Sequence, residues 1–68
     1  MTLFKKKADS FKKFKKGDLV YDLYYGSGII VDTDERFGEL EVRFREELTW
    51  LTPPTVESLQ LVSRYDAG

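Results

Sequence analysis

Alternation of apolar and polar residues along the chain predicts short strands. The clearest case is residues 39–45, ELEVRFR, in which Leu40, Val42 and Phe44 alternate with charged residues. A period of two with one polar face is typical of a strand that covers a core on one side. Four further strands are predicted at residues 19–23, 29–33, 48–52 and 59–62.

Turn-forming residues precede the first four of these strands. The turns are expected at Gly17-Asp18, residues 24–28, residues 34–38 and Glu46-Glu47. Pro53-Pro54 ends the fourth strand because proline cannot donate to a sheet ladder, and residues 55–58 are predicted as one helical turn. Short antiparallel strands joined by tight turns predict an all-β domain, and so small a sheet protects its edges best by curling into a barrel. We expect a five-stranded barrel over residues 14–63, a basic arm over 1–13 and a tail over 64–68.

The strand pattern also predicts the interior and the role of two glycines. Gly26 and Gly28 are expected at a sharp corner, where glycine supplies a positive φ or a close backbone approach. Residues 29–31 (IIV) do not alternate, as expected of a strongly bent strand. The predicted core residues are Val20, Ile30, Leu40, Val42, Phe44, Leu59 and Leu61.

Composition narrows the class of protein. At 68 residues the chain has room for one domain, and a chain of this length buries only about 60% of its unfolded surface. It contains no cysteine and no histidine, so neither a disulfide nor a zinc site is expected, and no cofactor is predicted. No apolar run approaches the roughly 18 residues of a membrane span, and no secretory signal is recognisable. A cytoplasmic protein of a bacterial cell, free or carried by a phage or plasmid, is expected.

The net charge of −1 hides a strong asymmetry between the two parts of the chain. Residues 1–16 contain seven lysines and one acid, a net charge of +6, whereas residues 17–68 contain four arginines and eleven acids, a net charge of −7. In the arm, Phe4, Ala8 and Phe11 fall on one face of a helix that would be marginal alone. Two interpretations stay open: a solubilising leader, or an arm that docks on nucleic acid or on the acidic body. Deleting residues 1–12 is expected to leave the barrel folded.

Residues 14–32, FKKGDLVYDLYYGSGIIVD, carry an aromatic residue, then Gly-Asp-x-Val, then Gly-x-Gly and aliphatics. This pattern resembles the opening of two bacterial modules. One is the RNA-polymerase-interaction domain of CarD-type regulators and transcription-repair coupling factor, and the other is the Tudor-like carboxy-terminal domain of UvrD/PcrA-type helicases. Short phage and mobile-element proteins are similar. The matching positions are Phe14, Gly17, Asp18, Val20, Gly26, Gly28 and Ile30, and residues 42–44 and 59–62 resemble the third and fifth strands of these modules.

The resemblance spans residues 14–62 and implies an SH3-like/Tudor-like barrel with RNA polymerase as its partner. The chain departs from the pattern in two respects. We expect no helical DNA-binding domain of the kind that follows in CarD-type proteins, and the Thr-Pro-Pro segment at residues 52–54 belongs to neither module. A free-standing module of this kind is expected to act by binding alone.

Catalysis is not expected from this composition. Histidine and cysteine are absent, and the acids fall mostly on polar strand positions or turns. Asp32, Asp34 and Glu35 lie close together, but they lack the spacing of a calcium loop and are typical of an acidic turn, so no metal site is predicted. The Gly-x-Gly precedes a strand and has no third glycine, which argues against phosphate binding.

Exposed aromatics are the candidate partner-binding residues, because strand alternation does not assign all of them to the core. Such rings can form a cage that holds a cation, or they can pack at the rim of the core. An exposed strand edge could instead pair with a partner's sheet. The candidates are Tyr24, Tyr25, Phe37 and Trp50.

Two alternative functions remain open at this stage. In the first, the barrel binds nucleic acid through the lysines of the arm, which would grip phosphate without reading sequence. These lysines are Lys5, Lys6, Lys7, Lys12, Lys13, Lys15 and Lys16. In the second, the acidic body occupies a basic channel of a host nucleic-acid enzyme and inhibits it.

Overall fold

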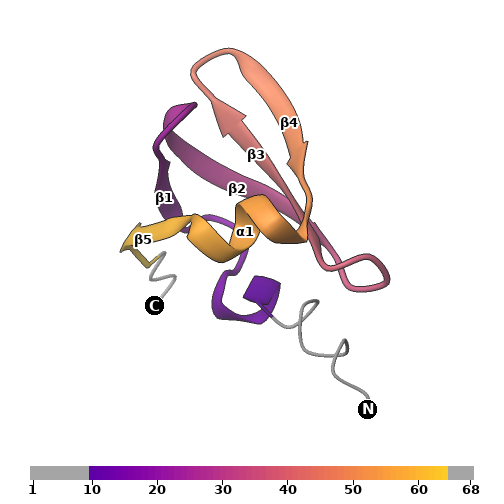
Figure 1. Ribbon diagram of the computed structural model, residues 1–68. Coiled ribbons are helices and arrows are strands. Elements are labelled where there is room, and N and C mark those ends of the chain that lie inside the picture. Colours follow the sequence, from indigo (N-terminus) through magenta and orange to yellow (C-terminus); the bar gives the residue numbers. More distant parts are fainter. Residues whose placement is uncertain (1–9, 65–68) are drawn as a thin grey trace.

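The computed structural model describes residues 10–64, which form a single antiparallel sheet with little helix (Figure 1). The strands are β1 (Leu19–Asp22), β2 (Gly26–Asp34), β3 (Glu39–Phe44), β4 (Glu47–Leu51) and β5 (Gln60–Ser63). A short 3₁₀ turn covers residues 10–13, and helix α1 (Pro53–Ser58) connects β4 to β5. The prediction of five antiparallel strands is therefore confirmed.

The strands follow the order β4-β3-β2-β1-β5 across the sheet. Strands β4 and β5 lie at its two ends and are not hydrogen-bonded to each other, so the sheet is not closed. Helix α1 crosses the space between these two strands (Figure 1). It begins with Pro53 and Pro54, whose missing N–H groups cost nothing in a first helical turn, and it buries Val56. No helix formed by residues 10–64 is long and apolar enough to cross a membrane.

Strand β2 begins three residues earlier than predicted, and this corrects the turn expected at residues 24–28. Gly26 pairs with Asp22, and Gly28 pairs with Val20. Gly26 has a φ of 90°, whereas a Cβ atom at Gly28 would lie 2.6 Å from Cγ1 of Val42. One glycine therefore supplies the positive φ and the other the close approach, as the sequence predicts for this pair.

Strand β2 bends after Ile30. Ile30 pairs with Val42 and Asp32 with Glu41, which are consecutive in β3, so Val31 is an extra residue of β2 without a partner of its own in this pairing. Such a bulge kinks a strand and increases its twist. It also explains why residues 29–31 do not alternate, because the inward and outward positions shift by one at Val31.

The core lies on one face of the sheet, beneath α1. Six predicted core residues are buried: Val20, Ile30, Leu40, Val42, Phe44 and Leu59. The prediction that Leu61 belongs to the core is wrong, because 37% of this residue is exposed. It lies opposite Val20, but all four residues of the edge strand β5 are exposed. Four side chains that the strand pattern did not assign complete the core: Phe11, Phe14, Leu51 and Val56.

The segment before β1 is connected to the sheet by backbone hydrogen bonds and by the side chain of Asp18. Gly17 donates its N–H to the carbonyl of Ile30 (2.8 Å), and Ile30 donates to the carbonyl of Asp18 (3.0 Å). The Asp18 side chain is buried and accepts the N–H of Lys15 at 3.0 Å. It also lies 3.8 Å from Nη1 of Arg64, just after β5. Phe11, which the sequence pattern placed in the basic arm, is buried in the core next to this segment.

Candidate protein-binding site at one end of the sheet

Two turns meet at one end of the sheet and bring together residues distant in sequence. Residues 23–25 connect β1 to β2, and Arg45-Glu46 connects β3 to β4. Both turns lie at the upper end in Figure 1, whereas the β2–β3 turn lies at the opposite end. This arrangement follows from antiparallel pairing, which places alternate turns at the same end.

A buried carboxylate holds the first of these turns. Asp22 is 6% exposed and accepts the backbone N–H groups of Tyr24 (2.8 Å) and Tyr25 (2.9 Å) on a single oxygen, Oδ2. An Asp side chain that bonds the backbone two and three residues ahead fixes a turn locally. The two tyrosines are therefore displayed from an ordered backbone.

The tyrosine rings form a short aromatic stack with the core. The Tyr25 ring lies 4.8 Å from Phe44 at an interplanar angle of 18°, and Tyr24 meets Tyr25 edge-on at 4.9 Å and 86°. Exposure rises outward along the stack, from 4% for Phe44 to 38% for Tyr25 and 85% for Tyr24. The core thus supports a protruding aromatic surface, which contains two of the four predicted partner-binding residues.

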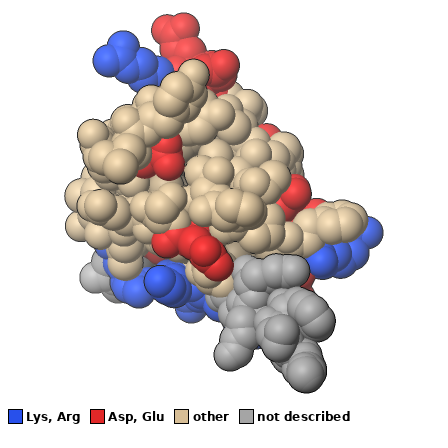
Figure 2. Space-filling view, in the orientation of Figure 1, with Lys and Arg blue, Asp and Glu red and all other residues tan. Residues whose placement is uncertain are grey.

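A pocket of about 530 Å³ opens beside this stack. Its lining residues come from the end of β1–β2 and from the β3–β4 turn: Tyr25, Phe44, Arg45, Glu46 and Glu47. Within residues 10–64, none of the three charged side chains forms an ion pair. In Figure 2, acidic and basic side chains lie together at this upper end of the molecule. The pocket therefore offers one flat aromatic wall and several ionic groups to a ligand.

Arg45 adopts an uncommon backbone conformation in this pocket. Its φ is 60°, and it is the one residue other than glycine with a positive φ within the described part of the chain. An L-residue in this region is held at a cost of about 1–2 kcal/mol. The sequence marked Glu46-Glu47 as the loop tip, but the tip is Arg45-Glu46 and Glu47 already pairs with Phe44.

The other two predicted binding residues lie elsewhere. Phe37 is in the β2–β3 turn at the opposite end of the sheet. The guanidinium carbon of Arg36 lies over its ring, 5.4 Å from the ring centroid. Trp50 lies on β4 opposite Glu41, and 43% of it is exposed. Neither ring stacks on another aromatic ring within residues 10–64. The four aromatics therefore do not form a single cage.

The predicted nucleic-acid-binding lysines divide into two groups. Lys5, Lys6 and Lys7 lie outside the described residues. Lys12, Lys13, Lys15 and Lys16 are all exposed around the 3₁₀ turn. Figure 2 shows basic side chains gathered along the lower edge of the molecule, at the other end from the tyrosine stack. The described lysines and the tyrosine stack thus occupy separate surfaces.

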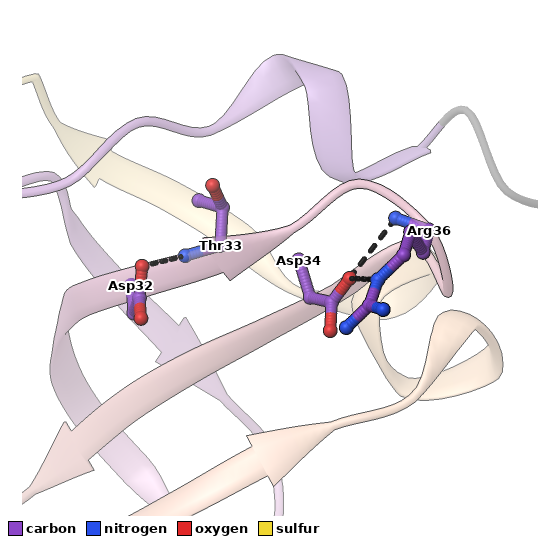
Figure 3. A network of polar contacts seen from close by, with 4 residues as sticks. All are labelled: Asp32, Thr33, Asp34 and Arg36. Carbon is purple, nitrogen blue, oxygen red and sulfur yellow. Dashed lines mark hydrogen bonds and ion pairs between the residues drawn. The ribbon is translucent and has the colours of Figure 1, made fainter.

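The acidic end of β2 is organised by its own contacts (Figure 3). Asp32 accepts the N–H of Thr33 at 2.8 Å. Asp34 accepts the N–H of Arg36 at 3.0 Å, and its Oδ1 lies 3.6 Å from Nε of the same residue. No group of three or more acidic residues within residues 10–64 is placed to hold a metal ion. The contacts are those of an acidic turn.

Comparison of the chain with protein-family models, curated proteins and solved structures finds no match. The resemblance of residues 14–62 to the two bacterial modules therefore stays a prediction that rests on the residues that carry it. Several of those residues have structural roles here. Asp18 anchors the start of β1, Gly28 makes room for Phe44, and Val20 and Ile30 are core residues.

Proposed function

We propose that this chain is a non-enzymatic protein-binding module that contacts RNA polymerase or its associated machinery in the cytoplasm of a bacterial cell, as a phage or bacterial modulator. The resemblance of residues 14–62 supplies the partner. The observation that carries the proposal is the aromatic surface formed by Tyr24 and Tyr25. Exposed tyrosines on an ordered backbone are suited to protein recognition, because they bury large area with little loss of side-chain freedom.

The fold supports the same proposal. The five antiparallel strands, with a short helix connecting β4 to β5, are compatible with the proposed SH3-like/Tudor-like barrel. The two most buried carboxylates, Asp18 and Asp22, both accept backbone N–H groups and hold turns. Both carboxylates therefore have structural roles in the fold.

Affinity capture from bacterial lysate tests this function. The intact chain is compared, with and without nuclease treatment, with Tyr24→Ala, Tyr24→Ala/Tyr25→Ala, Phe37→Ala and Trp50→Ala. Purified RNA polymerase is then titrated against each variant. Recovery of polymerase after nuclease treatment, with loss in the tyrosine variants and retention in Phe37→Ala, supports the proposal. Recovery of nucleic acid alone contradicts it.

A nucleic-acid-binding function is the second candidate, and the exposed group at Lys12, Lys13, Lys15 and Lys16 favours it. Phosphate contacts release counterions, so affinity would fall steeply with salt concentration, with a slope of about −0.7 per contact on single strands. Substituting these lysines by glutamine would reduce that slope. A protein contact through the tyrosine stack would keep its affinity when these lysines are substituted.

A further inference from the structure

We infer that the pocket beside Tyr25 binds an arginine side chain of the partner protein, so that the partner presents a basic segment to this end of the sheet. The inference rests on the proposed protein-binding function and adds the chemistry of the recognised residue. It follows from the shape of the Tyr25 surface, the carboxylates around it and the charge of the whole body.

The Tyr25 ring is stacked on Phe44 and is still partly exposed. Phe44 stacks nearly parallel to it, and Tyr24 meets it edge-on, yet 38% of Tyr25 is exposed and it lines the pocket. A planar guanidinium stacks well on an open tyrosine face, through both cation–π attraction and flat contact. A compact ammonium group matches this surface less closely, because it cannot stack.

Two carboxylates, Glu46 and Glu47, line the same pocket. Neither forms an ion pair within residues 10–64, so both are available to a cation. A guanidinium can donate to carboxylates through its fork of N–H groups while its plane lies on a ring. Arg45 reduces the local charge of these three residues from −2 to −1 without reversing its sign.

The net negative charge of the residues around the pocket also favours a positively charged ligand. Residues 17–64 contain ten acids and four arginines, a net charge of −6. Such a field attracts a basic segment over longer distances and repels an acidic one. The exposed lysines at positions 12, 13, 15 and 16 lie on or next to the 3₁₀ turn at the lower end in Figure 1, away from the pocket.

NMR titration with N-acetyl-arginine-methylamide tests the inference directly, with the citrulline analogue as a neutral probe of the same shape. We expect saturable shifts of the amides at residues 22–28 and 43–48 with the arginine probe, and affinity at least about threefold weaker with citrulline. Glu46→Gln/Glu47→Gln is expected to weaken arginine binding to a similar degree. Glu35→Gln/Glu39→Gln, which makes the same charge change at the opposite end of the sheet, is expected to weaken it much less.

Tyr25→Leu keeps an apolar contact with Phe44 but removes the ring, and it is expected to lower arginine affinity about two- to fivefold. Equal binding of arginine and citrulline, or equal effects of the two double-glutamine variants, would overturn the inference. The proposed function is judged separately by polymerase capture. If Tyr24→Ala/Tyr25→Ala loses the polymerase while Glu46→Gln/Glu47→Gln retains it, protein binding stands and the arginine pocket is wrong.

Discussion

Gly28 and Phe44 share one packing position, because the Phe44 ring lies where a side chain at residue 28 would be. A Cβ atom at Gly28 would approach Cδ1 and Cε1 of Phe44 to 2.7 and 2.8 Å. The same ring supports Tyr25. Because Gly28 has no side chain, the Phe44 ring can occupy this position in the core and support Tyr25 from there.

Gly28→Ala is expected to destabilise the domain by about 1–3 kcal/mol, because Phe44 and Val42 must move to admit the methyl group. Urea denaturation measures the loss. In a Phe44→Leu background the cost should fall, since part of the clash is gone. Gly26→Ala is the control: it has a φ of 90° and no atom within 4 Å of its Cβ position, so its cost comes from the backbone. An equal cost of Gly28→Ala in both backgrounds would contradict the packing argument.

Phe44→Ala is expected to cost about 3–5 kcal/mol, enough to unfold much of so small a domain, because it leaves a cavity in the core. Thermal melting followed by circular dichroism checks this. Leu48→Ala on β4 is the matched control, with 56% of Leu48 exposed, and should change stability by less than about 0.5 kcal/mol. Similar melting of the two variants would show that the described core is misassigned.

Phe11→Ala is expected to destabilise the domain by about 3–5 kcal/mol, since Phe11 is only 8% exposed within the core. Deletion of residues 1–12 removes the same ring and should cost at least as much. Lys13→Ala, an exposed neighbour on the same 3₁₀ turn, should be nearly neutral. If the deletion variant melts at the same temperature as the intact chain, Phe11 does not contribute to the stability of the core.

Asp18→Ala is expected to cost more than Arg64→Ala, although the two side chains face each other. Removing the carboxylate leaves the N–H of Lys15 without its acceptor, at a cost of about 1–3 kcal/mol. Only Asp18 of this pair is buried; the Arg64 side chain is 57% exposed and 3.8 Å away, so solvent screens its charge and its removal is expected to cost about 0–1 kcal/mol. Comparison of the two unfolding free energies checks this order, and a larger loss for Arg64→Ala would contradict it.

Arg45→Gly is expected to raise stability by about 1 kcal/mol, because glycine adopts a φ of 60° without the cost an L-residue bears. Glu46→Gly, at the adjacent turn position with a negative φ, should not raise the free energy of unfolding. Both free energies of unfolding come from urea titrations. A loss of stability in Arg45→Gly would show that the arginine side chain contributes more than its backbone costs.

The sequence pattern predicted β3 well because its buried residues alternate with charged ones, as in residues 39–45. It failed where contacts between distant segments decide the outcome. Leu61 has the alternation of an inward residue, but it lies on an uncovered edge and is 37% exposed. Phe11 looked like part of a lysine-rich arm, and only its packing on the sheet identifies it as core.

The candidate site shows the same limit. Tyr24 and Tyr25 were predictable from their position beside a glycine turn, since aromatics in a turn are not claimed by strand alternation. The sequence did not predict that Phe44 and Arg45-Glu46-Glu47 belong to the same site, because no local pattern places the β3–β4 turn beside the β1–β2 turn. That proximity depends on sheet order, which only the structure supplies.

The sheet order also has a consequence for how the domain forms and opens. Three of its four pairings join consecutive strands, whereas β1 pairs with β5 across the intervening residues 23–59. Closing so long a loop costs more entropy than closing a hairpin, so the β1–β5 pairing is expected to form last. Strand β5, with all four residues exposed, should then be the first strand to detach. Its amide hydrogens should exchange with solvent at a lower free energy than those of β2 and β3, while the two turns beside Tyr25 stay closed.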